Sequence, residues 1–156
     1  FKYWLELVKV LLLPNPFKNV LSAAAAGRAM KKGILSHDPD ANVEMIPIAD
    51  GGDGSLKLLI KYFGAELMSS TVLDPIGRTI DAQLGFNLET DIAIIESAEA
   101  SGIRLLSSNE YNPFKVHTFG TGELITEAIV KGAQTFYLAV GGSATQDGVF
   151  SILKAL

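Results

Sequence analysis

Four short segments of this 156-residue sequence combine glycine with polar side chains in a way that suits phosphate and magnesium chemistry. They are residues 15–19, 50–54 (DGGDG), 120–122 (GTG) and 141–148 (GGSATQDG). Glycine lets backbone N–H groups approach a ligand closely, and the N-terminus of a following helix favours an anion. Mg²⁺ takes one or two carboxylates together with phosphate oxygens. These segments are therefore the candidate site, although tight turns also require glycine and the residues alone leave both interpretations open.

The elements that must position these segments alternate between strand and helix. Short apolar runs predict strands at residues 9–13, 43–49, 92–96 and 135–140. Capping residues, alanine content and terminal glycines predict helices at residues 23–35, 56–63, 123–130 and 149–156. A β-rich segment near residues 66–88 turns at the sequence PIGR.

The alternation predicts one α/β domain over residues 1–156. We expect a mostly parallel sheet with helices on both faces, in a Rossmann-like three-layer arrangement. The strands within 9–13, 43–48, 92–95 and 135–140 are expected to share one sheet, the first, second and fourth running parallel. Ligands bind beyond the carboxyl ends of such strands, so Lys18, Asp50 and Asp147 are expected to cluster there.

Composition excludes several classes of function. The net charge of −4 and the absence of a basic stretch argue against a nucleic-acid partner. No cysteine is present, which excludes disulfides and thiolate chemistry and fits a reducing cytoplasm. No apolar stretch approaches the ~20 residues that span a bilayer, so no membrane partner is expected. The Walker A, GxGxxG and GxSxG patterns are also missing.

Six short stretches, in order, resemble the glycerate kinase family, the class that phosphorylates D-glycerate with ATP. They are PNPFK with LSA (14–18, 21–23), ADGGDGS (49–55), DPIGR (74–78), IESAEASGI (95–103), GTGELI (120–125) and GGSATQDGV (141–149). The resemblance extends over nearly the whole chain but covers only the N-terminal portion of a family member. It implies a longer two-lobed kinase, with a C-terminal lobe or a partner chain completing the fold.

The same resemblance implies the ligands and the site. D-glycerate and ATP would be the substrates, with Mg²⁺ as cofactor, and Lys18 and Asp50 would be catalytic. Asp50 and Asp147 would hold the metal, while Asp53, Glu96 and Glu123 would contact the substrate or support the residues that do. Phosphate and nucleotide would be bound by Gly51, Gly52, Gly120, Thr121, Gly122, Gly141, Gly142, Ser143 and Thr145. For most of these residues helix capping or solvent exposure is the alternative explanation.

This sequence departs from the family pattern at several positions. Asn15 and Pro16 replace an aspartate and a serine, and an amide cannot act as an anionic ligand or base. Val149 replaces a glycine, and a valine is not expected to adopt positive φ. We therefore expect this chain alone to have little glycerate kinase activity. Two alternatives stay open: a non-catalytic nucleotide- or anion-binding module, and a structural fragment with an exposed sheet edge.

Overall fold

The computed structural model describes residues 9–17 and 20–156, so Lys18 lies outside the described residues. Contacts within the chain divide it into two compact units, the first ending at Asp50 and the second beginning at Gly51. Each unit is described by itself.

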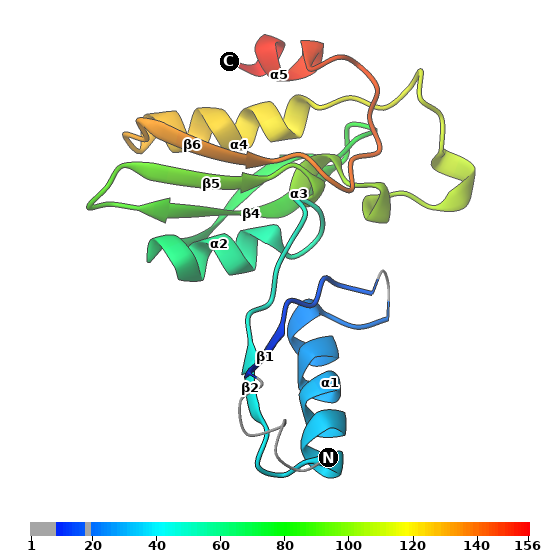
Figure 1. The fold of residues 1–156 in the computed structure, drawn as a ribbon. Helices are drawn as coiled ribbons and strands as arrows, with labels where there is room; N and C mark the ends of the chain where they lie inside the picture. Colours follow the sequence, from blue (N-terminus) through cyan, green and yellow to red (C-terminus); the bar gives the residue numbers. More distant parts are fainter. Residues whose placement is uncertain (1–8, 18–19) are drawn as a thin grey trace. The chain divides into compact units, whose positions relative to one another are not determined.

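The first unit is a β–α–β arrangement (Figure 1). Strand β1 (Lys9–Leu12) pairs in parallel with β2 (Asn42–Met45), and helix α1 (Ala23–His37) connects them. The helix begins where the Ser22 hydroxyl accepts a hydrogen bond from the Ala25 N–H at 3.2 Å, as expected of an N-cap serine.

The second unit contains a four-stranded sheet in the order β3-β4-β5-β6. Strands β3 (Glu66–Leu73) and β4 (Thr79–Asn87) form an antiparallel hairpin. Strand β5 (Ile92–Glu96) pairs antiparallel with β4 and parallel with β6 (Thr135–Ala139). The hairpin accounts for the β-rich segment that the sequence predicts.

Helices cover both faces of this sheet (Figure 1). Helix α2 (Ser55–Phe63) packs on β4 and β5, and α4 (Phe119–Val130) packs on the opposite face. The buried core between sheet and α4 takes alternate residues of β4, such as Leu84 and Phe86, with Leu124 of the helix. A short helix α3 (Ala98–Ser101), the 3₁₀ turns η2 (Ile103–Leu105) and η3 (Ser108–Glu110), and helix α5 (Phe150–Ala155) complete the unit.

The α/β class and the helices on both faces are confirmed, but the prediction of one sheet is wrong. Within the described residues β1 and β2 form a separate two-stranded sheet, and the four-stranded sheet is mixed rather than mostly parallel. The four-stranded sheet is mixed because two tight turns reverse the chain: the turn of the β3–β4 hairpin, and the turn between β4 and β5, where the Asn87 side chain accepts hydrogen bonds from the Glu89 and Thr90 N–H groups. This turn returns β5 alongside β4, and β6 takes the other edge of β5.

Candidate functional site

Residues 51–54 of the predicted 50–54 loop are in direct contact with the predicted 141–148 loop. The Gly141 N–H donates a hydrogen bond to the Gly51 carbonyl at 2.7 Å. A Cβ atom added to Gly141 would lie 2.6 Å from the backbone nitrogen of Gly52, so no larger residue fits without moving the backbone. The two DG-containing motifs, 90 residues apart in the chain, therefore form one loop cluster. We use this name for residues 51–54 and 141–148.

The end of α3 holds the 141–148 loop from the other side. The Ile103 N–H donates to the Gly142 carbonyl at 2.9 Å, and the Ala144 N–H donates to the Ser101 carbonyl at 2.8 Å. The Ser143 hydroxyl lies 2.9 Å from the hydroxyl of Ser97. Gly142 and Ser143 are exposed, so a ligand can reach them.

Glu96, at the end of β5, supplies the cap that α2 lacks. The N-cap residue Gly54 has φ 92° and no side chain to accept a hydrogen bond. The Glu96 carboxylate accepts instead from the Gly54 N–H at 3.2 Å and the Leu56 N–H at 2.9 Å. Because a buried carboxylate of the protein itself lies at this helix start, α2 does not offer its N-terminus to a phosphate.

Burial raises the pKa of the Glu96 carboxyl above its ordinary value. The hydrogen bonds from Leu56 and Gly54 oppose this effect, and the nearby carboxylates of Glu99 and Asp53 add to it. Glu96 is thus a buried acid that stabilises the end of the 51–54 loop and the start of α2, and its pKa is sensitive to the charges around it.

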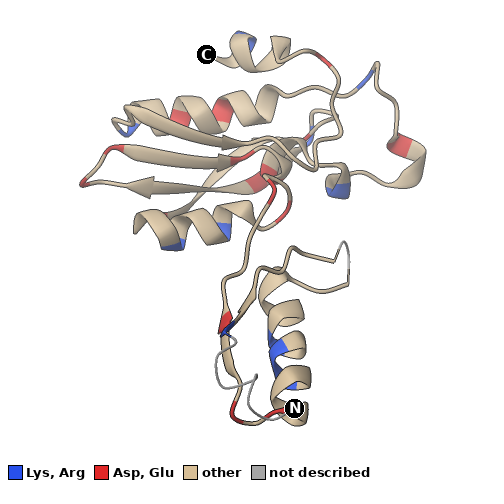
Figure 2. Ribbon diagram, viewed as in Figure 1, with Lys and Arg blue, Asp and Glu red and all other residues tan. Residues whose placement is uncertain are grey.

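Arg104 forms ion pairs with two acidic side chains, Asp53 of the loop cluster and Glu99 of α3. Its Nη2 lies 2.5 Å from Glu99 Oε1, and its Nε lies 3.3 Å from Asp53 Oδ1 (Figure 2 shows the charged residues along the chain). Sequence reasoning identified Asp53 but missed Glu99 and Arg104. Their spacing of five crosses the end of α3, so no helical periodicity indicated that they pair.

The GTG motif forms the first turn of α4 rather than an open loop. A Cβ at Gly120 would lie 1.8 Å from the Leu73 carbonyl oxygen, and one at Gly122 would lie 2.7 Å from the Ala155 Cβ. The fully buried Thr121 hydroxyl lies 2.7 Å from the hydroxyl of Ser101. These contacts explain the two glycines and the threonine by packing, and phosphate binding by them stays a prediction.

Glu123 has a structural contact in the same helix. Its Oε2 accepts a hydrogen bond from the Leu73 N–H at 2.7 Å, which attaches α4 to the end of β3. This contact supports a positioning role in the fold, and substrate contact by Glu123 stays a prediction.

Asp147 connects the starts of two helices. Its Oδ2 accepts from both the N–H and the hydroxyl of Thr118, at 3.0 and 2.9 Å. Burial raises the pKa of Asp147, but hydrogen bonds from Ser151 and Thr118 outweigh it and the pKa is lowered overall. Over the described parts of the chain, no three histidine, aspartate or glutamate side chains converge in a group that could hold a metal.

In the first unit, Asn15 and Asp50 are paired. The Asn15 Nδ2 donates to Asp50 Oδ2 at 3.3 Å across an exposed surface. The predicted cluster of Lys18, Asp50 and Asp147 stays a prediction, because Lys18 lies outside the described residues and the two aspartates belong to different units.

The fold and the loop cluster define an α/β protein whose glycine-rich loops meet beside the end of β5. The sequence model of the glycerate kinase family matches residues 10–156, and the chain belongs to this family. It is 36% identical over 147 residues to the glycerate kinase of Halalkalibacterium halodurans, covering 94% of this chain and 39% of that one. It is 34% identical to the glycerate 2-kinase of Escherichia coli, covering 96% of this chain and 39% of the relative.

A solved structure gives the same result. The crystal structure of a putative glycerate kinase 2 from Salmonella typhimurium LT2 aligns with a TM-score of 0.73 at 32% sequence identity. The alignment covers 96% of this chain and 40% of the Salmonella chain. This chain therefore spans about two fifths of the length of the relatives it matches. Within the described residues, every helix is too short or too polar to cross a membrane.

Proposed function

We propose that this chain carries part of the active site of an ATP-dependent glycerate kinase. The observation that supports this best is the hydrogen bond from Gly141 to Gly51, because it unites two family motifs in one loop cluster. The exposure of Gly142 and Ser143 there suits a phosphate, which binds to closely approaching backbone N–H groups. The name of the Escherichia coli relative supports the 2-hydroxyl of glycerate as the acceptor.

In the proposed reaction, a glycerate hydroxyl oxygen forms a bond to the γ-phosphorus of ATP. The bond from that phosphorus to the β–γ bridging oxygen breaks, and ADP leaves. Asp50 accepts the hydroxyl proton, and Lys18 offsets negative charge on the transferring group. Gly51, Gly52, Gly141, Gly142, Ser143 and Thr145 surround the phosphates. Most of the rate enhancement in such a transfer comes from positioning and electrostatics.

In this proposal two aspartates, Asp50 and Asp147, hold Mg²⁺. The lowered pKa of Asp147 keeps its carboxylate ionised at neutral pH, and Asp50 is exposed. Mg²⁺ needs only one or two carboxylates beside phosphate oxygens, and we assign that role to Asp50 and Asp147. When bound, the ion neutralises phosphate charge. This assignment is part of the proposal.

Completion of the site by further polypeptide is also part of the proposal. Strand β6 lies at the end of the sheet order, with Tyr137 and Leu138 each 41% exposed. An apolar strand with one unpaired edge is a template for another strand. The relatives are longer than this chain, so we propose that a C-terminal lobe or a partner chain covers β6. A cytoplasmic location follows from the proposed substrates.

A chimera tests the function. Residues 10–156 would replace the matching region of the Halalkalibacterium halodurans glycerate kinase, and ADP release would be measured with D-glycerate. Activity that Lys18→Ala abolishes and the exposed control Lys115→Ala leaves intact supports the proposal. A folded chimera that stays inactive after Asn15→Asp and Val149→Gly restore the family residues contradicts it.

One observation favours a second candidate, a non-catalytic nucleotide-binding module. Asn15 occupies the place of an acid and binds Asp50, which leaves the pair one negative charge short. ATP binding by the chimera, with no turnover until Asn15→Asp is introduced, would favour this candidate over an active kinase.

A further inference from the structure

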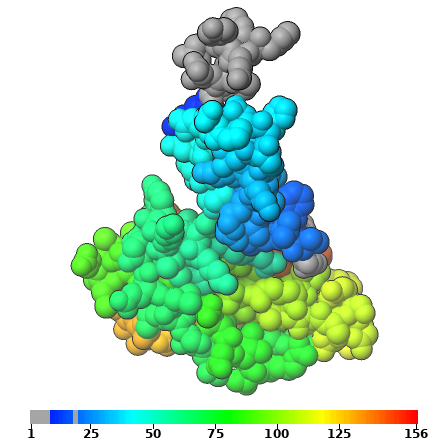
Figure 3. All heavy atoms as spheres, turned by 90° about the horizontal axis from the view of Figure 1, so that it is seen from below, coloured from blue at the N-terminus to red at the C-terminus, as the bar shows by residue number. Residues whose placement is uncertain are grey.

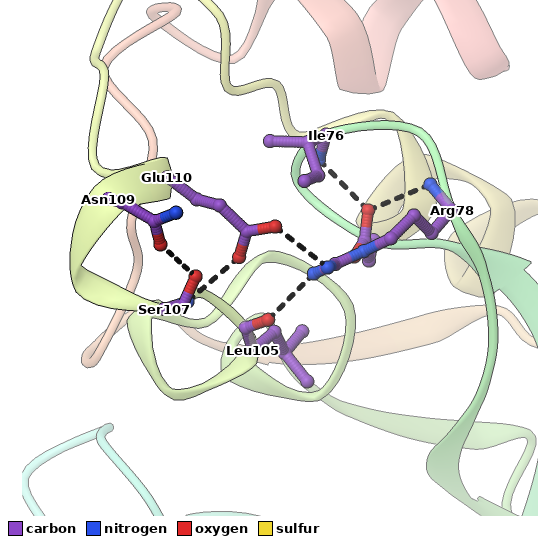
Figure 4. A network of polar contacts seen from close by, with 7 residues as sticks. Ile76, Arg78, Leu105, Ser107, Asn109 and Glu110 are labelled. Atoms are coloured by element: carbon purple, nitrogen blue, oxygen red, sulfur yellow. Dashed lines mark hydrogen bonds and ion pairs between the residues drawn. The ribbon is translucent and has the colours of Figure 1, made fainter.

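The DPIGR motif has no role in the proposed chemistry, yet its two charged side chains form several hydrogen bonds and ion pairs. Asp74, between β3 and β4, has no exposed surface. Its Oδ1 accepts the Ile76 N–H at 2.9 Å and the Arg78 N–H at 2.8 Å, and its Oδ2 forms an ion pair with Arg78 Nε (Figure 4). The buried carboxylate therefore closes the turn and sets the direction of the Arg78 side chain.

The remaining guanidinium nitrogens of Arg78 reach a distant segment. Nη1 donates to Glu110 Oε1 at 3.0 Å, and Nη2 donates to the Leu105 carbonyl at 2.8 Å (Figure 4). The second oxygen of Glu110 accepts the Ser107 N–H at 2.8 Å in a capping box that starts η3. Arg78 thus binds both ends of residues 105–110, which no single-point cation could do.

The segment that Arg78 holds runs from the loop cluster to the start of α4. At one end Ile103 bonds to Gly142, and Arg104 pairs with Asp53. At the other end the His117 N–H donates to the Pro75 carbonyl at 2.9 Å. Between them the chain is at the surface, shown yellow-green in Figure 3, with Phe114 97% exposed. Its buried apolar side chains are Leu106 and Val116, so its polar anchors contribute to how often the segment opens.

We infer that Arg78, oriented by Asp74, is a positioning residue that holds residues 103–117 against the turn between β3 and β4. It acts through Leu105 and Glu110, and so keeps the Ile103–Gly142 contact of the loop cluster formed. An isolated exposed ion pair contributes little, but a fork fixed by a buried carboxylate and a backbone carbonyl is preorganised. The importance of this segment for the loop cluster as a phosphate site rests on the proposed function. Its attachment by Arg78 does not.

Amide hydrogen exchange, followed by mass spectrometry on this chain, tests the inference. Arg78→Lys and Glu110→Gln should each speed exchange in residues 103–117 by about tenfold, the effect of losing one charged hydrogen bond. A smaller increase is expected in residues 141–148, and none in α2. The control Lys131→Gln also breaks an exposed ion pair, with Glu127 on α4, and should leave residues 103–117 unchanged.

The outcomes separate the possibilities. Unchanged exchange in residues 103–117, or an equal increase in every peptide, would overturn the inference. So would faster exchange in residues 103–110 with no change at 141–148, because Arg78 would then anchor η3 without affecting the loop cluster. None of these readouts uses kinase activity, so failure of the proposed function leaves them interpretable.

Chemical rescue gives a second, geometric test. Arg78 is 48% exposed on its side chain, so a small cation can enter the space left by Arg78→Ala. Millimolar guanidinium chloride should restore slow exchange in residues 103–117, whereas ammonium chloride should not, because only the planar fork reaches three acceptors. Equal rescue by both salts, or by neither, would contradict a positioning role for the fork. If Arg78→Ala does not fold, Glu110→Gln still decides the question.

Discussion

Removal of the Glu96 carboxylate should destabilise the second unit by an amount that its contacts predict. Glu96→Ala leaves the N–H groups of Gly54 and Leu56 without their acceptor and removes the only side-chain cap that the described residues give α2. An unsatisfied buried donor costs about 1–3 kcal/mol, and loss of an N-cap costs about 0.5–2 kcal/mol. These overlap, so we expect a loss of about 2–4 kcal/mol in the free energy of unfolding.

Glu96→Gln separates the hydrogen bonds from the charge. The amide oxygen can still accept one N–H, and the cost of burying a charge disappears, so a smaller loss of about 1–2 kcal/mol is expected. Urea unfolding followed by far-ultraviolet circular dichroism measures both variants. Glu127→Gln, a change at a half-exposed site on α4, is the control and should stay within about 0.5 kcal/mol of the parent chain.

The difference in stability between the parent chain and Glu96→Gln should depend on pH with a defined sign. Burial raises the pKa of Glu96, so the folded state holds its proton to a higher pH than the unfolded state does. The part of the stability that comes from this bound proton is therefore complete below the ordinary pKa of 4.5. It is lost as the pH rises through the raised pKa. The stability of the parent chain relative to Glu96→Gln should fall as the pH rises from about 4.5. A loss of stability below about 0.5 kcal/mol for Glu96→Ala would refute the capping argument. A stability of the parent chain relative to Glu96→Gln that rises with pH would refute the raised pKa.

Three further changes test the loops. Val149→Gly should stabilise the chain by about 1 kcal/mol in urea unfolding, because Val149 has φ 69° and is 51% exposed; a loss of stability would show that its side chain matters more than its backbone. Gly141→Ala should cost about 1–3 kcal/mol by forcing a Cβ against the Gly52 nitrogen, whereas Gly33→Ala, with open space around it, should not destabilise. Hydrogen bonds lower the pKa of Asp147, so its stabilising contribution should be present above pH 3.8 and disappear as the pH falls further. Asp147→Asn should lack that acid-dependent loss in a pH series of thermal unfolding.

The sequence by itself determined the local features of this protein. Apolar runs and glycine-bearing turns located the strands and the hairpin at residues 66–88, and the helix predicted from residue 23 begins there, capped by Ser22. The glycine-to-valine departure pointed to residue 149 as a special backbone position. Val149 nevertheless adopts positive φ, contrary to expectation, at the N-cap of α5, where its carbonyl accepts the Leu153 N–H.

Only the tertiary structure decided which distant groups meet. Glu96 caps a helix that begins about 40 residues earlier, and Arg78 binds Glu110 across 32 residues. Gly120 and Gly122 belong to helix packing although their motif is typical of a phosphate loop. Periodicity and propensity report on neighbours along the chain, and they carry no information about the partner of a side chain or the order of strands in a sheet. Those are set by strand pairing and packing, which place residues far apart in sequence side by side.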